Sequence, residues 1–310
     1  MKLAFSTLGC PDFDWADIYS MAKDFGFSGI EMRGLGDNIF SINARPFQKE
    51  NLPKTIQLLH QKRLEICCLS SGCALKFGDR TEETLDELRR YIDLAAELHT
   101  PFIRVLGDLT AAPQGEVDDE LVLSSLKRII PYAEEKNVTL LVETNGVYAD
   151  TARLRELLNQ IESDNIGALW DFHHPYRYAG ESPETTVQNL GAYIKYTHAK
   201  DSVIQDGKTV YKIMGEGDLP MDAIMRALRS INYEGYISLE WLKRYAPDLS
   251  DPGIVFPHFA NFMEQYMDRS EDIRRLYDNH AKTGKYVWPK EHLIDLTFPQ
   301  VLDRMVEEFP

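Results

Sequence analysis

The chain has 310 residues, 44% of them hydrophobic and 27% charged, an ordinary globular composition with room for one large domain and an appendage. Its net charge of −15 argues against a general nucleic-acid binder, because phosphate backbones attract basic surfaces. We expect a cytoplasmic protein with reduced cysteines and no membrane partner, since no apolar run is long enough to span a bilayer and the four cysteines lack metal-ligand spacing.

Short apolar, β-branched runs alternate with amphipathic segments along the first 245 residues. Such runs are typical of buried parallel strands, and the segments between them have helical periodicity. Strands are expected at 3–6, 29–32, 64–70, 102–107, 138–143, 166–171, 193–199 and 235–241. Helices are expected at 14–25, 50–62, 81–98, 119–136, 150–162 and 219–230. The last helix should open on Asp218, with Pro220 in its first turn.

Eight strands separated by helices, at a spacing of roughly 30 residues, match an α/β fold of the (β/α)8 TIM-barrel type. A doubly wound open sheet agrees less well with the sequence. Such a sheet usually carries a glycine-rich phosphate loop after its first strand, whereas the chain has GCPDFD at 9–14. The sequence therefore predicts a closed barrel.

The last part of the chain departs from the strand–helix repeat. Residues 254–280 predict a closing helix, and TFPQVLDRMVEEFP at 297–310 predicts a further helix with a capping-box start. We therefore expect a barrel over 1–280 and a C-terminal helical extension over 281–310. The extension resembles the opening helix of AMP-forming acyl-CoA synthetases, which implies a covalently fused C-terminal domain. The alternative is a terminal helix packed on the barrel or on the second subunit of a homodimer.

Four acidic or imidazole side chains lie at the ends of predicted strands, namely Glu143, Asp171, His198 and Glu240. Because the carboxyl ends of all strands in a parallel barrel meet at one face, these side chains should converge. Three carboxylates and an imidazole in one pocket would repel one another unless a cation lay among them. The sequence therefore predicts a site for one divalent metal ion. The ligand types suit Mn²⁺, Mg²⁺, Co²⁺ and Zn²⁺ and do not choose among them.

Further motifs surround these positions: FSGIEMRG (27–34), LLVETNG (140–146), ALWDFHHP (168–175), YTHAKD (196–201), MGEGDLPM (214–221) and GYISLEW (235–241). With them, residues 1–245 resemble the xylose isomerase-like TIM-barrel superfamily and are similar to its ketose 3-epimerases and inosose dehydratases. The resemblance implies that Glu143, Asp171, His198 and Glu240 hold one divalent ion. It also implies a sugar isomerase or epimerase in which Glu143 and Glu240 remove and return a proton across an enediolate.

The expected substrate-binding residues are His174, Lys200, Asn145, Arg33 and Trp241. By the resemblance, His174 and Lys200 contact substrate oxygens. Arg33 should face the same rim, and Trp241 is a candidate wall for the apolar face of a sugar ring. Many relatives have a histidine in place of Asn145, but an amide can also hydrogen-bond a sugar hydroxyl.

Three alternative functions compete with the epimerase. An inosose dehydratase-type lyase would use the same ligands and the same proton abstraction, so the sequence does not separate the two. An apurinic endonuclease needs further histidines at the second to fourth strand ends, where the chain reads LSSGCALKF and VLGDLTAAP. A non-catalytic sugar-binding module would have no reason to keep all four ligand-type residues. The expected partner is therefore a small-molecule sugar or polyol rather than nucleic acid.

Overall fold

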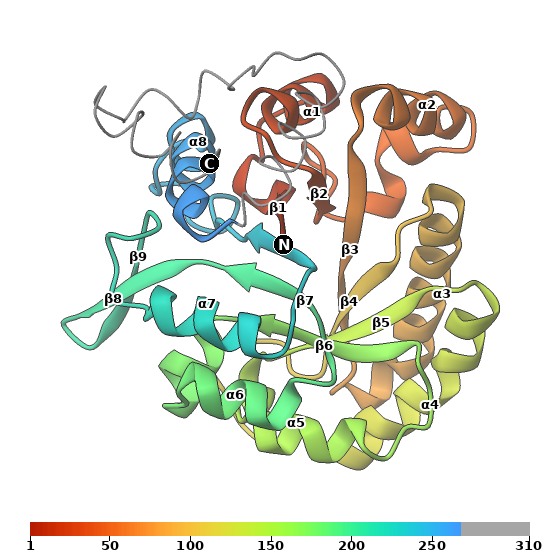
Figure 1. The fold of residues 1–310 in the computed structure, drawn as a ribbon. Coiled ribbons are helices and arrows are strands. Elements are labelled where there is room, and N and C mark those ends of the chain that lie inside the picture. Colours follow the sequence, from red (N-terminus) through yellow and green to blue (C-terminus); the bar gives the residue numbers. More distant parts are fainter. Residues whose placement is uncertain (268–310) are drawn as a thin grey trace, which may run out of the picture. The chain divides into compact units, whose positions relative to one another are not determined.

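Eight parallel strands close into a barrel in the computed structural model, which describes residues 1–267 (Figure 1). The strands are β1 (Lys2–Ser6), β2 (Gly29–Met32), β3 (Glu65–Ala74), β4 (Phe102–Leu106), β5 (Thr139–Glu143), β6 (Ile166–Asp171), β7 (Ile194–Ala199) and β10 (Tyr236–Leu239). Neighbouring strands pair in chain order, and β1 closes the ring by pairing with β10 in parallel. The predicted barrel is confirmed.

In the described part of the chain, eight α-helices connect and surround the strands. They are α1 (Trp15–Asp24), α2 (Leu52–Lys62), α3 (Thr81–Leu98), α4 (Asp119–Glu135), α5 (Thr151–Leu158), α6 (Pro183–Leu190), α7 (Met221–Ser230) and α8 (Pro252–Met263). The sequence analysis did not single out α6, which is short and buries few side chains. It also missed an antiparallel hairpin of β8 (Asp201–Gln205) and β9 (Lys208–Lys212), which follows β7 directly.

Several predicted helix boundaries differ from the structure, and helix α5 ends at Leu158, four residues before the predicted end. Helix α7 begins at Met221, with Pro220 as its N-cap and no capping side chain, so the predicted cap at Asp218 is wrong. The backbone N–H of Asp218 donates to the carbonyl of Ser202, and its carboxylate pairs with Arg177, which holds it in the preceding loop. Helix α8 begins at Pro252, two residues before the predicted closing helix, and ends at Met263.

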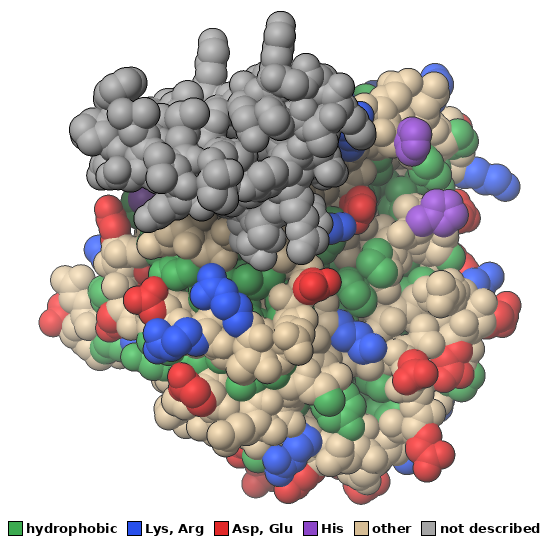
Figure 2. Space-filling view, in the orientation of Figure 1, with side chains coloured by type: hydrophobic (Ala, Val, Ile, Leu, Met, Phe, Trp, Pro, Cys, Tyr) green, Lys and Arg blue, Asp and Glu red, His purple; other side chains and the backbone are tan. Residues whose placement is uncertain are grey.

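The remaining C-terminal predictions lie outside the described residues. They comprise the closing helix beyond residue 267, the extension over 281–310, the fused domain and the homodimer contact. All of them stay predictions. Within residues 1–267, none of the helices is both long enough and apolar enough to cross a bilayer. On the face shown in Figure 2, acidic and basic side chains are interspersed over the described surface rather than gathered into a basic patch.

A buried cluster of apolar and aromatic side chains fills the inside of the ring. Its members come from six of the eight barrel strands: Ala4, Cys67, Cys68, Leu141, Leu169, Tyr196 and Tyr236. Burial raises the pKa of both cysteine thiols, so they are uncharged packing groups rather than nucleophiles. This packed interior supports the carboxyl ends of the strands, where the candidate site lies.

Leu141→Ala is expected to lower the free energy of unfolding by about 2–5 kcal/mol, because it leaves a cavity inside a closely packed ring. Leu141 is fully buried on β5, two residues before Glu143. The loss is measured by urea unfolding followed by circular dichroism. Ile254→Ala is the matched control, since Ile254 is 60% exposed and its loss should change stability by less than about 0.5 kcal/mol. Equal effects of the two substitutions would contradict the packing described here.

Candidate functional site

Four side chains from four strands meet at the carboxyl end of the barrel. Glu143 ends β5, Asp171 ends β6, His198 lies near the end of β7, and Glu240 follows β10 directly. One potential ligand atom from each lies within 4.8 Å of the others, and all four residues are buried. The structure thus brings together the four residues that the strand spacing selected. We call them the strand-end cluster.

The two ring nitrogens of His198 face different partners. Nδ1 points into the strand-end cluster, 3.1 Å from Glu143 Oε1, 3.6 Å from Glu240 Oε1 and 3.8 Å from Asp171 Oδ2. On the other side of the ring, Nε2 lies 2.9 Å from Glu31 Oε2. A carboxylate that binds one ring nitrogen fixes the orientation of the imidazole and leaves the other nitrogen to ligate a metal. Nδ1 is therefore the nitrogen that could bind an ion.

Glu31 on β2 is a site residue that the sequence analysis missed. Its buried carboxylate also accepts hydrogen bonds from Ser70 Oγ at 2.6 Å and Ser238 Oγ at 2.8 Å. Burial alone would raise the pKa of Glu31, but the facing imidazole of His198 and the hydrogen bond from Ser70 bring it down to about 2. The available signal was an acidic residue inside the apolar run GIEM, where a charge is costly unless it is paired.

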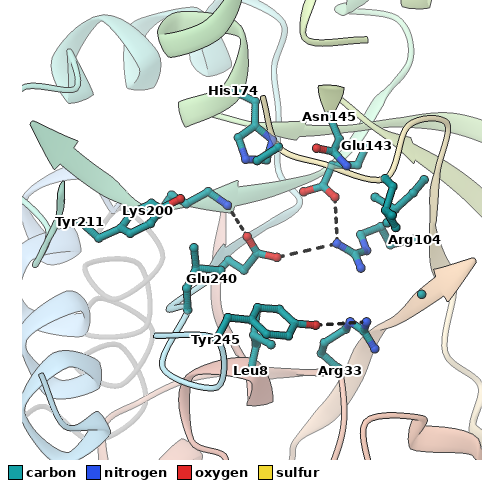
Figure 3. Close-up of a pocket in the computed structure, with 15 residues that line it drawn as sticks. Leu8, Arg33, Arg104, Glu143, Asn145, His174, Lys200, Tyr211, Glu240 and Tyr245 are labelled. Carbon is teal, nitrogen blue, oxygen red and sulfur yellow. Dashed lines mark hydrogen bonds and ion pairs between the residues drawn. The ribbon is translucent and has the colours of Figure 1, made fainter. Parts of the chain in front are cut away.

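Two basic side chains reach the strand-end cluster (Figure 3). Arg104 from β4 donates from Nη1 to Glu143 Oε2 at 2.9 Å, and the same nitrogen lies 3.9 Å from Glu240 Oε1. The Nζ atom of Lys200 lies 2.5 Å from Asp171 Oδ2 and also contacts Glu240. The sequence analysis predicted Lys200 but missed Arg104, whose signal was a cation inside the apolar run FIRVL.

These contacts set the protonation of the cluster. Burial would raise the pKa of Glu143, but Arg104 and His198 hold it well below its usual range. Burial acts on Glu240 in the same way, and Lys200 and His198 bring its pKa down to about 2. The pKa of His198 is raised well above its usual range, despite its burial, by the surrounding carboxylates. Without an ion, the imidazole is therefore protonated and the glutamates are ionised.

The charges around the cluster match one divalent ion. The strand-end cluster and Glu31 together carry four carboxylates. Among the described residues, Arg104 and Lys200 are the lysine or arginine side chains that pair with them. Two negative charges are then left when His198 is neutral, as a metal ligand must be. One divalent cation would balance them.

The dimensions of the cluster also suit an ion. Ligand atoms on opposite sides of one ion lie about 4.4 Å apart, because each metal–oxygen distance is about 2.2 Å or shorter. The observed limit of 4.8 Å requires a small contraction. Three carboxylates and an imidazole in this arrangement could hold a divalent metal ion whose identity they do not fix.

A cavity of about 290 Å³ lies at the cluster (Figure 3). Glu143 and Glu240 line it together with four of the predicted substrate-binding residues: His174, Lys200, Asn145 and Arg33. Tyr211 from the β8–β9 hairpin and Tyr245 from the loop after β10 contribute further lining that the sequence analysis did not predict. The pocket is therefore polar on its floor and has room for a small molecule.

His174 and Asn145 both present polar atoms at this pocket. The Nδ1 atom of His174 lies 3.2 Å from the carbonyl oxygen of Thr144, so this nitrogen carries the hydrogen when the ring is neutral. Burial lowers the pKa of His174 and favours that neutral form. Asn145 donates from Nδ2 to the carbonyl of Asp108 at 2.9 Å, and its buried Oδ1 has no partner in residues 1–267.

Trp241 is the predicted substrate-binding residue that the structure does not bring into the pocket. Its side chain is buried, and Nε1 donates to the carbonyl of Ser250 at 2.9 Å. Glu240 and the following residue Leu242 line the cavity, whereas Trp241 packs against the Gly9 side of the barrel. Adjacent side chains on an extended segment point in opposite directions, which explains why Trp241 and Glu240 do not share the pocket.

Glu31→Gln is expected to weaken Mn²⁺ binding by about 10–100-fold, the usual effect of removing a carboxylate that orients a ligating histidine. Glutamine keeps the shape of the side chain but removes the charge that faces Nε2 of His198. The affinity is measured by calorimetric titration of metal-free protein with MnCl₂. The matched control is Glu65→Gln at the start of β3, which should bind Mn²⁺ as the wild type does. Unchanged affinity in Glu31→Gln would contradict this role.

The family model described as xylose isomerase-like TIM barrel matches residues 19–266. The chain belongs to this family. The resemblance expected from the motifs is thereby confirmed, and the matched segment includes the whole strand-end cluster.

Several proteins of known name share the xylose isomerase-like barrel. Fructoselysine 3-epimerase from Shigella flexneri is 23% identical over 260 residues, which cover 79% of this chain and 91% of that protein. The crystal structure of the IolI protein with a zinc atom has a TM-score of 0.71 at 16% identity, over 86% of this chain and 100% of that chain. The crystal structure of the probable 3-DHS dehydratase AsbF from Bacillus anthracis has a TM-score of 0.70 at 21% identity, over 85% of this chain and 99% of that chain. At these identities the two structures show a shared fold alone.

Proposed function

We propose that the chain is a metal-dependent sugar isomerase or epimerase, which moves a proton on the carbon beside the carbonyl of a ketose or a related polyol ketone. The observation that carries this proposal is the buried strand-end cluster, of which Glu143 and Glu240 line a cavity of about 290 Å³. The similarity to a fructoselysine 3-epimerase supports an enzyme of the epimerase type. The metal dependence and the residue roles are inferred from the geometry of the site, and the ketose substrate from the resemblance to 3-epimerases.

Glu143, Asp171, Nδ1 of His198 and Glu240 would hold the ion, which is one of Mn²⁺, Mg²⁺, Co²⁺ or Zn²⁺. When bound, such an ion supplies Lewis-acid polarisation of a substrate carbonyl, which makes the neighbouring C–H more acidic. Glu31 fixes the His198 ring, so that Nδ1 faces the three other ligands. The chain's own residues then have to bind the ketone and transfer its proton.

Glu143 and Glu240 are the groups that would transfer the proton. Their lowered pKa values keep both as carboxylates at neutral pH, which is the form that a general base requires. Each has one oxygen toward Nδ1 of His198 and the other toward a cation, Arg104 for Glu143 and Lys200 for Glu240. One glutamate removes the proton from one face of the substrate. The other glutamate takes up a proton from water and returns it to the opposite face, and the first then releases its proton to water.

Three further residues would position the substrate. Neutral His174 carries its hydrogen on Nδ1, so Nε2 can accept a hydrogen bond from a substrate hydroxyl. The free Oδ1 of Asn145 can accept another. Lys200, held beside Asp171 and Glu240, offers an ammonium group to the oxygen that becomes negative after proton removal.

A dehydratase is the second candidate, and the position of Lys200 favours it. Loss of a hydroxyl after proton abstraction needs an acid beside the leaving oxygen, and the Lys200 ammonium lies within the pocket at the abstracting carboxylates. The same residues can therefore serve either outcome. Ketohexoses and inososes both carry a hydroxyl one carbon beyond the C–H that loses its proton. Loss or retention of that hydroxyl therefore separates the two reactions.

The products distinguish these two reactions. Ketohexoses and inososes are incubated with the Mn²⁺-loaded protein and followed by NMR. A new epimer of a ketohexose is the expected result. Loss of water from an inosose would instead assign the dehydratase. If the protein holds a metal and converts none of these compounds, the assignment to simple ketoses and inososes is wrong.

A further inference from the structure

Arg33 differs from the other basic residues of the pocket because no carboxylate within residues 1–267 forms an ion pair with it. Arg104 and Lys200 each form ion pairs with residues of the strand-end cluster. Within residues 1–267, Arg33 donates from Nη1 to the carbonyl of Ile39 at 3.0 Å and from Nη2 to the Tyr245 hydroxyl at 3.4 Å. A guanidinium has five N–H donors, so these two bonds leave three for another partner.

The surroundings of Arg33 make an unpaired charge costly. The residue is partly buried, and its pKa is lowered first by burial and then by repulsion from Arg104. Arginine nevertheless stays protonated at all ordinary pH values. A charged group that has lost water and has no counter-ion is stabilised by an anion that binds beside it.

The pocket leaves space for such an anion beside the guanidinium. Gly72 lines the cavity next to Arg33. A Cβ atom added at Gly72 would lie 3.3 Å from Nη2 of Arg33, so the absence of a side chain at this position leaves the guanidinium uncovered. Figure 3 shows Arg33 and Tyr245 on one side of the pocket and His174 and Asn145 on the other, with Glu240 between them. A ligand that reaches both sides would place one end at Arg33 and the other at His174.

The net charge of the site with its metal ion bound also favours an anionic ligand. This inference rests on the proposed function. One divalent ion, Arg104 and Lys200 balance the four carboxylates of Glu31 and the strand-end cluster. Arg33 then remains as one positive charge in excess. A neutral sugar would leave this charge unmatched, whereas a substrate with one acidic group would neutralise it.

We propose that Arg33 binds an anionic group of the substrate, so that the chain acts on acidic ketoses in preference to neutral ones. A planar guanidinium matches two oxygens of a carboxylate or a phosphate. The substrate class is therefore a ketose or polyol ketone with a carboxylate or phosphate at the end remote from its reacting carbon.

The test compares three ketohexoses that differ at carbon 6: D-tagatose, D-tagaturonate and D-tagatose 6-phosphate. Their dissociation constants are measured by calorimetry on the Mn²⁺-loaded protein. We expect at least one of the acidic compounds to bind at least about tenfold more tightly than D-tagatose. In Arg33→Gln this ratio should fall below about threefold. The acidic compound that binds more tightly identifies the source of the anionic group.

Arg128→Gln is the matched control, since Arg128 lies on the exposed surface of α4 and pairs with Glu82. It should keep the preference of the wild type. Equal binding of the three compounds by the wild type, binding of none, or an undiminished preference in Arg33→Gln would each overturn the proposal.

Proton exchange, followed by NMR on the same samples in D₂O, separates this inference from the proposed function. Arg33-dependent binding of an acidic ketose without C–H exchange would support the anion site and contradict the isomerase. Exchange at the same rate on neutral and acidic ketoses, with equal affinities, would support the isomerase and overturn the anion site.

Discussion

Glu240→Gln and Glu143→Gln are each expected to lower kcat by about 10²–10⁴-fold, the usual contribution of a positioned acid or base. An amide has nearly the shape of the carboxylate but does not take up a proton. The loss should appear in kcat for proton transfer, measured by NMR with the substrate at saturation. Circular dichroism and the urea midpoint should stay close to those of the wild type, because the buried hydrogen bonds of each side chain can partly re-form.

Glu216→Gln is the control for these two variants. Glu216 lies in the exposed turn between β9 and α7, away from the pocket lining, so its replacement should change kcat by less than about twofold. A Glu240 or Glu143 variant that is folded and keeps more than a tenth of the wild-type kcat would contradict the two-glutamate mechanism.

His198→Ala is expected to weaken Mn²⁺ binding by more than about 100-fold, because loss of a ligand should exceed the effect of losing the carboxylate that orients it. His198 is the nitrogen ligand of the cluster, and its Nδ1 is the atom that faces all three carboxylates. The affinity is measured by calorimetry, and bound manganese is counted by mass spectrometry after gel filtration.

Two further variants keep this prediction falsifiable should His198→Ala be unstable. His60→Ala replaces an exposed histidine on α2 and should bind Mn²⁺ as the wild type does. Glu31→Gln should have a smaller effect than His198→Ala. A folded His198→Ala protein that binds one manganese ion with wild-type affinity would show that the ion lies elsewhere.

The sequence was sufficient to predict the barrel and the strand-end cluster. Both depend on periodicity along the chain, because apolar runs mark the strands and polar residues at their ends mark the face where they meet. Position at a strand end was enough to predict the four residues of the strand-end cluster. Barrel closure then brought their ligand atoms within 4.8 Å of one another.

Glu31 and Arg104 could not be placed in the same way. Each lies inside an apolar run, so nothing local shows whether its side chain points into the ring or onto a helix. Their partners are set by strand register: Glu31 pairs in register with Ser6 and Cys68, and Arg104 with Ser70. Such neighbours are distant in sequence, and single-chain patterns do not reveal them.

The β8–β9 hairpin was missed although a local signal was present. Asp206 and Gly207 connect the two strands with φ angles of 50° and 73°, the left-handed conformation that Asp-Gly favours in tight hairpin turns. The strands were too short and polar to stand out between two barrel units. As a result, the contribution of Tyr211 to the pocket was also missed.

The most direct test of the account is hydrogen exchange at carbon in D₂O, with and without Mn²⁺ in otherwise identical samples. Metal-free protein is mixed with the ketohexose panel, including the acidic members, and deuterium incorporation beside the carbonyl is followed by NMR. We expect incorporation that appears when Mn²⁺ is added and disappears with a chelator, and Glu240→Gln should form the epimer about 10²–10⁴-fold more slowly than the wild type. Incorporation at the same rate without a divalent ion, or none with manganese bound at the strand-end cluster, would contradict the account.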